Sequence, residues 1–235
     1  MDITVRTNAL KEQSGSTIAI ANIEFADQFK VKNITVKEGK NGRFVSMPSV
    51  ATSRTDEQGN TIYNDIFNPI TAKGREELTK AVLDSLDTGN PVVIKDESKT
   101  NEISATIRPL ENGINGAVGI GRLYLNDDYV VNSIVIKQAS KGGEFVAFPS
   151  YKSNEVDEQG KAVYKDFAYP SNKESRDKIT GIIMDAFNKA KEISKDEIVA
   201  DEVKPKGVKA KLKEGQKKSK ETASAPKKAR EDKER

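Results

Sequence analysis

Apolar and polar residues nearly alternate along two stretches of the chain, 18–25 and 118–125, which lie a hundred positions apart. Their apolar positions are Ile18, Ile20, Ile23, Phe25, Val118, Ile120, Leu123 and Leu125. Alternation of this kind predicts β-strands that are buried on one face. The short polar stretches 26–28 and 126–128 follow directly and suit hairpin loops. Each stretch therefore predicts the beginning of an antiparallel β-sheet.

Further extended segments follow in the same order in both halves. In the first half, 31–36 predicts one strand and 44–47 another, which ends at Pro48 because proline has no N–H to donate. The tetrapeptide DEQG occurs at 56–59 and again at 157–160. Polar residues followed by a glycine predict a turn between extended segments. The tetrapeptide lacks the spaced carboxylates of a calcium loop, so we expect no metal site there.

The apolar period becomes helical towards the end of each half. The stripe holds Leu78, Ala81, Val82 and Leu86 in the first half, and Ile179, Ile182, Ile183, Ala186, Phe187 and Ala190 in the second. These stripes predict one amphipathic helix in each half. Ser171, with Glu174 three residues later, predicts a capping box for the second helix. Thr71 is a candidate cap for the first helix, although Gly74 stands where the glutamate would be.

The two halves are copies of one another. Residues 42–86 align without a gap on 143–187, and 15 of these 45 positions are identical. We infer a tandem duplication of a unit of roughly 85 residues. The predicted class is α+β, in which each unit is an antiparallel β-meander of four or five strands followed by an amphipathic helix. The predicted domains are 1–87, a linker at 88–101, a second unit with an extended C-terminal helix at 102–200, and a tail at 201–235.

Composition removes several functional classes. The chain has no Cys, His or Trp, which excludes disulfides, the usual zinc sites and the nucleophilic arrangements that depend on His or Cys. No apolar run approaches the length of about 20 residues that crosses a bilayer, and the N-terminus does not resemble a signal peptide. We expect a soluble, cytoplasmic protein without a cofactor, a metal, a catalytic residue or a membrane partner.

The basic charge of the chain is concentrated in the tail. Residues 201–235 hold 13 Lys and Arg and 7 Asp and Glu, a net charge of +6, whereas the residues before them hold 26 and 29, a net charge of −3. The tail has few apolar residues, so we predict that it is disordered. Its lysines are candidates for attracting phosphate, and a purely solubilising tail is the alternative. The tail candidates are Lys217, Lys218, Lys227 and Lys228.

Several motifs, taken in order, resemble the stage V sporulation protein G (SpoVG) family of septation regulators. They are FVSMPS at 44–49, Asp65-Ile66, Pro69-Ile70 and Arg75. The second copy departs from them at Phe148, Phe167 and Ser171. The resemblance implies a small, dimerising α+β unit of bacterial cytoplasm that binds DNA and RNA and modulates gene expression and septum formation. Two units in one chain predict an intramolecular pseudo-dimer, and association with a second chain stays open.

The resemblance also indicates where nucleic acid would bind. The family follows its MPS motif with a basic pair, but here only Arg54 and Lys152 stand near that position. The other candidate cations of the folded part lie around the helix starts: Lys73, Arg75, Arg176 and Lys178. A salt bridge to a neighbouring carboxylate is the alternative for the two arginines. We expect core or interface roles, rather than base stacking, for Phe44, Phe145, Met47 and Phe148, and local backbone hydrogen bonds, rather than catalysis, for Asp65 and Asp166.

Two functions therefore stay open. The first is a non-enzymatic regulator that binds DNA or RNA through the cations named above. The second is a protein-interaction or scaffolding module in which nucleic-acid binding is weakened or lost. The missing basic pairs favour the second function, and the basic tail favours the first.

Overall fold

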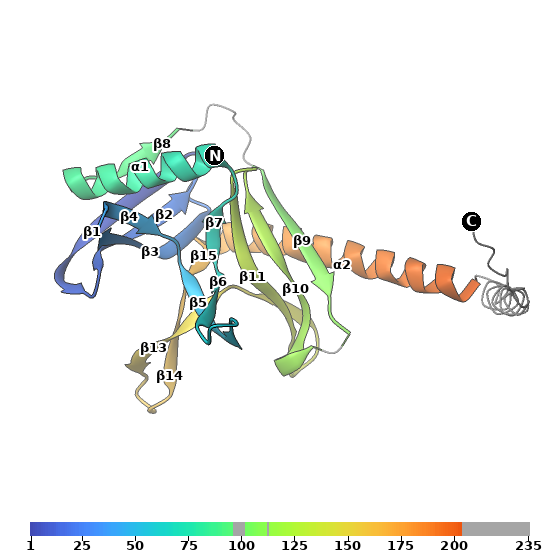
Figure 1. Cartoon of the computed structure of the whole chain (residues 1–235). Helices are drawn as coiled ribbons and strands as arrows, with labels where there is room; N and C mark the ends of the chain where they lie inside the picture. The colour runs from blue at the N-terminus through green and yellow to red at the C-terminus, as the bar shows by residue number, and fades with distance from the viewer. Residues whose placement is uncertain (96–101, 112, 204–235) are drawn as a thin grey trace, which may run out of the picture. The chain divides into compact units, whose positions relative to one another are not determined.

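A computed structural model describes residues 1–95, 102–111 and 113–203 of the chain (Figure 1). The first copy contains β1 (Ile3–Ser14), β2 (Thr17–Phe25), β3 (Phe29–Gly39), β4 (Gly42–Ser46), β5 (Ser49–Thr55), β6 (Thr61–Asp65), β7 (Phe67–Pro69) and α1 (Ala72–Thr88). Strand β8 (Val92–Ile94) follows it. The second copy contains β9 (Ile103–Pro109), η1 (Ile114–Gly116), β10 (Ala117–Leu125), β11 (Tyr129–Gln138), β12 (Glu144–Ala147), β13 (Ser150–Val156), β14 (Ala162–Asp166), β15 (Ala168–Pro170) and α2 (Lys173–Val203).

The first four strands of each copy form an antiparallel meander, of which the sequence pattern predicts the second, third and fourth strands but not β1 or β9. Strands β1 to β4 pair in sequence order, and so do β9 to β12. Equivalent positions differ by 100 in the first three strands of each copy and by 101 from Gly42 onwards. The α+β class and the repeated unit of meander plus helix are therefore confirmed. The predicted disordered tail, 201–235, lies almost wholly outside the described residues.

One short strand of each copy pairs with the sheet of the other copy. Strand β7 of the first copy pairs with β11 of the second, and β15 of the second pairs with β3 of the first. Both copies lie within one compact unit, Met1–Lys191. The predicted intramolecular pseudo-dimer is therefore confirmed. The two copies are joined by the reciprocal exchange of β7 and β15.

The exchange is accompanied by a shared aromatic core. Phe67, on the exchanged strand β7, stacks on Tyr129 of the second copy with ring centroids 5.8 Å apart. It also meets Phe25 of its own copy edge to face at 6.0 Å. All three rings are at least 98% buried. Burying large aromatic rings between the copies favours the paired state over separate units.

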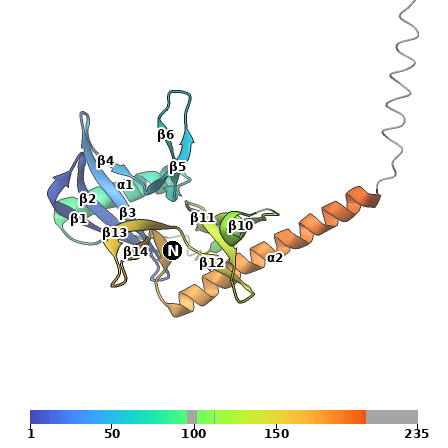
Figure 2. The ribbon, with the colours of Figure 1, turned by 90° about the horizontal axis from the view of Figure 1, so that it is seen from below.

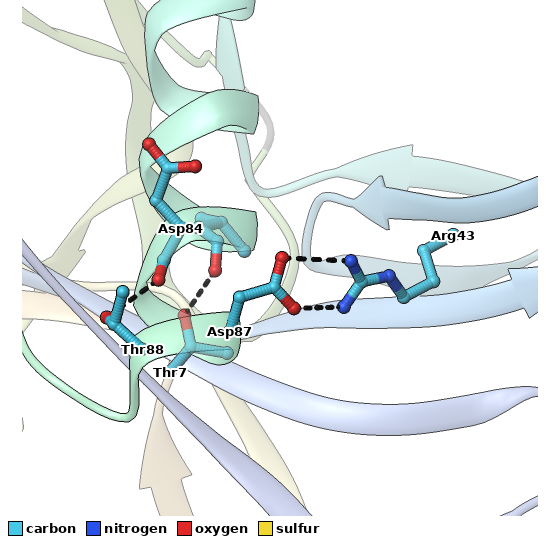
Figure 3. Close-up of polar contacts among 6 residues, drawn as sticks. Thr7, Arg43, Asp84, Asp87 and Thr88 are labelled. Carbon is cyan, nitrogen blue, oxygen red and sulfur yellow. Dashed lines mark hydrogen bonds and ion pairs between the residues drawn. The ribbon is translucent and has the colours of Figure 1, made fainter.

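Helix α1 is fixed to its own sheet by specific hydrogen bonds (Figure 3). Thr7 on β1 donates its hydroxyl to the carbonyl oxygen of Val82 at 3.0 Å, and its N–H to Oγ of Ser85 at 3.0 Å. Near the end of the helix, Arg43 from β4 forms a two-pronged ion pair with Asp87 at 2.6 and 3.0 Å. The helix then ends at Gly89, whose left-handed φ of 68° allows the chain to turn back.

The helix starts confirm one predicted cap and correct the other. Thr71 caps α1, because its side chain accepts a hydrogen bond from the N–H of Gly74 at 3.0 Å. The predicted Ser171–Glu174 capping box is wrong. The side chain of Asn172 caps α2 by accepting from the N–H of Ser175 at 2.9 Å. Ser171 precedes the cap and donates its hydroxyl to Glu24 of the other copy instead.

Two of the four predicted core or interface residues lie at the surface. Met47 and Phe148 pack against the core as expected. Phe44 and Phe145, however, are 49% and 47% exposed. The reason is strand alternation: Val45 faces the core, so Phe44 projects from the opposite face of β4. Among the described helices, none is both long and apolar enough to cross a membrane.

Candidate nucleic-acid interface

After its PS motif each copy forms a separate two-stranded hairpin. These are β5–β6 and β13–β14, which stand apart from the sheets (Figure 2). Each hairpin ends in the predicted DEQG turn, in which the side chain of Asp56 or Asp157 accepts backbone N–H groups within the turn. The hairpins present two exposed tyrosines at equivalent positions, Tyr63 at 62% and Tyr164 at 66%.

A groove of about 720 Å³ lies between the first hairpin and the second sheet. We call it the Arg108–Arg122 groove. One wall comes from the first copy and the other from the outward face of β9, β10 and β11. It is lined by Tyr63, Asn64, Asp65, Asn68, Ile70, Thr106, Arg108, Ile120, Gly121, Arg122, Tyr124, Val130, Asn132 and Ser133. The groove therefore exists only because the two copies are paired.

Hydrogen bonds between the copies hold the two walls in place. The backbone N–H of Asn132 donates to the carbonyl oxygen of Ile66 at 2.7 Å. Its side-chain amide donates to the carbonyl oxygen of Asp65 at 3.0 Å and to the side chain of Asn68 at 3.1 Å. Asp65 thus accepts a long-range hydrogen bond at its backbone oxygen from the other copy, rather than the local hydrogen bond that was expected. A preformed groove loses little conformational freedom when a ligand binds.

The groove contains two exposed arginines whose side chains form no ion pair with a described carboxylate. Arg108 and Arg122 are exposed and stand on the outward face of the adjacent strands β9 and β10. Neither guanidinium has an ion pair or a hydrogen bond with any described residue. Asp65 is the sole carboxylate among the lining residues. The local charge is therefore positive, although the folded part as a whole is acidic.

Two aromatic rings accompany these arginines. Tyr63 stands on the hairpin wall and Tyr124 on the sheet wall, two residues after Arg122 and on the same face of β10. Aromatic side chains beside a basic groove are the usual means by which proteins bind unpaired bases. The combination suits a ligand that carries both phosphate and planar rings.

The equivalent face of the first copy differs in its chemistry. Asn8, Asn22 and Glu24 occupy the positions of Arg108, Arg122 and Tyr124. Of its cations, Arg6 is exposed with no hydrogen bond or ion pair to a described residue, whereas Lys30 forms an ion pair with Glu24 at 3.1 Å. Lys32 lies over the ring of Tyr169 at 5.0 Å from the centroid. The duplication has therefore produced two faces of the same shape with different charge patterns.

The predicted cations of the folded part lie elsewhere. Arg54 and Lys152 are exposed on the hairpins, and Lys73 pairs with Glu77 at 3.9 Å. At the helix starts, Arg75 donates to the carbonyl oxygen of Pro69 at 3.5 Å, and Arg176 stands 5.7 Å from the ring of Phe148. Lys178 donates to the side chain of Gln28 at 3.1 Å. Neither helix-start arginine has the alternative salt bridge with a described carboxylate.

None of these predicted cations lines the groove. Lys217, Lys218, Lys227 and Lys228 lie outside the described residues, and their role stays a prediction. Sequence reasoning missed Arg108, Arg122, Tyr63 and Tyr124. The available signal was the outward register of β10, where Arg122 and Tyr124 alternate with the buried Leu123 and Leu125. Recognising it requires the pairing of the copies, because the other wall comes from a distant part of the chain.

Comparison with known proteins matches both copies to one family. The sequence model of the family described as SpoVG matches residues 1–88 and 101–189. A SpoVG septation protein of Clostridium novyi is 35% identical over 88 residues, covering 37% of this chain and 77% of the relative. Relatives of the same description from Clostridium perfringens and Treponema denticola are 38% identical over 88 residues and 39% over 84, covering 90% and 84% of their lengths and 37% and 36% of this chain. No solved structure matches.

Proposed function

Because the chain belongs to the SpoVG family of septation proteins, we propose that it is a non-enzymatic regulator that binds single-stranded DNA or RNA in the Arg108–Arg122 groove. Its binding modulates gene expression or formation of the division septum. The observation that carries the proposal is the pair of exposed arginines without described partners in a groove that also holds two tyrosines.

Electrostatics supports the arginine pair as the phosphate-binding element. Phosphate contacts supply most of the affinity of proteins for nucleic acid, and guanidinium groups bind phosphate oxygens in a two-pronged geometry. An arginine already paired with a carboxylate would have to give up that partner. Arg108 and Arg122 have no such competitor among the described residues. They replace, in function, the basic pairs that are absent after the PS motifs.

The shape of the groove supports a single strand rather than a duplex. Its volume of about 720 Å³ is that of a small-ligand site and accommodates individual nucleotides. Tyr63 and Tyr124 offer ring faces on which unpaired bases stack, worth about 1–3 kcal/mol per base in other proteins. Bases inside a duplex are stacked on one another and leave no free face for either ring.

The test uses the full chain and two charge-matched double variants. We would measure the fluorescence anisotropy of a labelled single-stranded RNA, and of the corresponding DNA, across a salt series. Arg108→Ala with Arg122→Ala should weaken binding at least tenfold and lower the salt slope by about 1.4, because about 0.7 is lost for each phosphate contact. Lys30→Ala with Lys32→Ala removes the same charge from the other face and should change affinity less than threefold.

Equal losses in the two double variants would show that net charge alone attracts the nucleic acid. Undiminished binding by both double variants would indicate that nucleic acid binds at the tail or at the helix starts instead of the groove. Absence of binding by the unmodified chain would refute the proposal. This result would favour the second candidate function, protein binding. That function is supported by the outer edge of β9, which has no partner strand within the described ranges.

A further inference from the structure

The two sheets end differently at one edge. In the first sheet, β8 pairs with the outer edge of β1, with Ile94 opposite Ile3 and Val92 opposite Val5. In the second sheet, β9 occupies the position of β1 and is the last strand in the order β12-β11-β10-β9. No described strand pairs with its outer edge (Figure 1).

The two copies also differ at the residue that ends the first helix. Helix α1 ends at Gly89, which takes a left-handed conformation, and the chain returns along the sheet as β8. The equivalent position in the second copy is Ala190, for which that conformation is unfavourable. Helix α2 accordingly continues through Ala190 to Val203. Within the described residues, no strand therefore returns along the second sheet.

Backbone groups on this edge have no partner strand in the part of the chain that the structure describes. Glu102 and Leu110 direct their backbone groups towards β10, since Asn126 donates to Glu102 and Leu110 donates to Val118. The direction of the backbone N–H and C=O groups alternates from one strand residue to the next. The odd-numbered residues Ile103 and Ala105 therefore direct their N–H and C=O groups away from β10. Unpaired strand edges of this kind accept an additional strand.

The adjoining core is also less covered than its counterpart. Ile3 and Val5, which lie beside β8, are 3% and 0% exposed. At the equivalent positions, Ile103 and Ala105 are only partly buried. No described residue thus supplies the second copy with the apolar cover that Val92 and Ile94 give the first.

We propose that the outer edge of β9 binds an extended segment of a partner protein, which adds to the sheet as an antiparallel strand. The chemistry of this segment follows from β8, which occupies the equivalent edge. It carries apolar residues at two alternate positions, as Val92 and Ile94 do, to cover Ile103 and Ala105. This binding mode is strand addition, in which backbone hydrogen bonds give affinity and alternate side chains give specificity.

Charge specifies one further position of the segment. In the first copy, Lys95 follows β8 and forms an ion pair with Asp2 at 2.8 Å. The position equivalent to Asp2 is Glu102, which is exposed and keeps the acidic character. The expected segment therefore places a lysine or an arginine directly after its second apolar residue.

A blocked synthetic peptide with the sequence of residues 89–95, GNPVVIK, serves as the probe. Titration into the isotopically labelled full chain should shift the backbone amide signals of Ile103 and Ala105 most, and those of β1 least. N-methylation of the peptide at the position of Val92 removes an N–H that would face β9, and should weaken binding at least tenfold. The same modification at the position of Val93, whose N–H points away, is the matched control and should be tolerated.

Ala105→Pro tests the edge from the protein side. It removes an outward N–H and leaves the pairing of β9 with β10 intact, so it should abolish the shifts while the chain stays folded. Absence of peptide binding at millimolar concentration, or equal effects of the two N-methyl groups, would refute the proposal. Sedimentation of the full chain without peptide supplies the remaining outcome. A dimer that Ala105→Pro dissociates would assign the edge to a second copy of the chain and overturn the partner-protein proposal.

Discussion

Gly119 on β10 lies directly beneath the ring of Phe187 on α2. A Cβ atom at Gly119 would stand 2.8 Å from Cε2 of that ring, which is closer than carbon atoms approach one another. At the equivalent positions the first copy has Ala19 and Leu86. The larger ring in the second copy is thus matched by a smaller residue in the strand below it, and each core is packed in its own way.

This complementarity predicts the effect of exchanging the pair. Gly119→Ala alone should lower the free energy of unfolding by about 1–3 kcal/mol, because the added methyl group overpacks the core. Phe187→Leu alone should also destabilise the chain, because it leaves a cavity. The double variant recreates the pair of the first copy and should be more stable than the sum of the single effects implies. Urea denaturation measures all three, and strict additivity would contradict the packing argument.

The sequence predicted those parts of the fold that depend on local pattern. Alternation and helical stripes predicted the helices and the meander except for its first strand in each copy, and the repeat predicted two equivalent units. The exchange of β7 and β15 was not predictable in the same way. These strands have three residues each, too few to show a period, and their partners lie in the other copy. The cap of α2 was misassigned because Ser171 and Asn172 are both good capping residues.

The corrected cap gives a second prediction. Asn172→Ala should lower the free energy of unfolding by about 1 kcal/mol, since it removes the acceptor for the N–H of Ser175. Glu174→Ala should cost only a few tenths of a kcal/mol, through the loss of a negative charge near the helix start. Thermal unfolding followed by circular dichroism would compare them. A larger loss of unfolding free energy for Glu174→Ala than for Asn172→Ala would support the capping box instead.

The groove was harder to predict than the fold for a related reason. Its two walls lie in different copies, so Tyr63 and Arg122 have no relation in the sequence that marks them as neighbours. The cations chosen from sequence all lie near motifs or in the tail. Arg108 and Arg122 belong to no motif, and their proposed role rests on the pairing of the copies and on a groove lining with a single carboxylate, that of Asp65.

The two hairpin tyrosines provide a matched pair for testing that groove. Tyr63 lines it, whereas the equivalent Tyr164 belongs to the other hairpin and is similarly exposed. Tyr63→Ala should weaken binding of single-stranded RNA by about 1–3 kcal/mol if a base stacks on the ring. Tyr164→Ala should leave the affinity nearly unchanged. Anisotropy titrations would decide, and equal effects of the two substitutions would argue against base stacking in the groove.

The ion pair between Arg43 and Asp87 predicts a pH dependence. The hydrogen bond from Arg43 lowers the pKa of Asp87 below its usual value. A carboxylate with a lowered pKa stabilises the folded state fully at neutral pH, and this contribution is lost as the pH falls through the folded-state value. Asp87→Asn should therefore destabilise the chain at pH 7 and have a smaller effect near pH 2. Denaturation at both pH values measures this, and an equal effect at both would mean that the charge of Asp87 is not involved.

The end of α1 supplies the last prediction, because it controls whether a sheet edge is covered. Gly89→Ala places a side chain at a φ of 68°, so it should cost about 1 kcal/mol and loosen the return of the chain along β1. Ala190→Gly should cost a similar amount by a different route, since glycine is unfavourable inside a helix. Hydrogen exchange separates the two effects. The amides of Val92 and Ile94 should exchange faster in Gly89→Ala alone, because only that change disturbs the strand that covers Ile3 and Val5. Unchanged protection of β8 in Gly89→Ala would show that the left-handed glycine is not what directs the chain onto the sheet, and the absence of such a glycine would then no longer explain the open edge of β9.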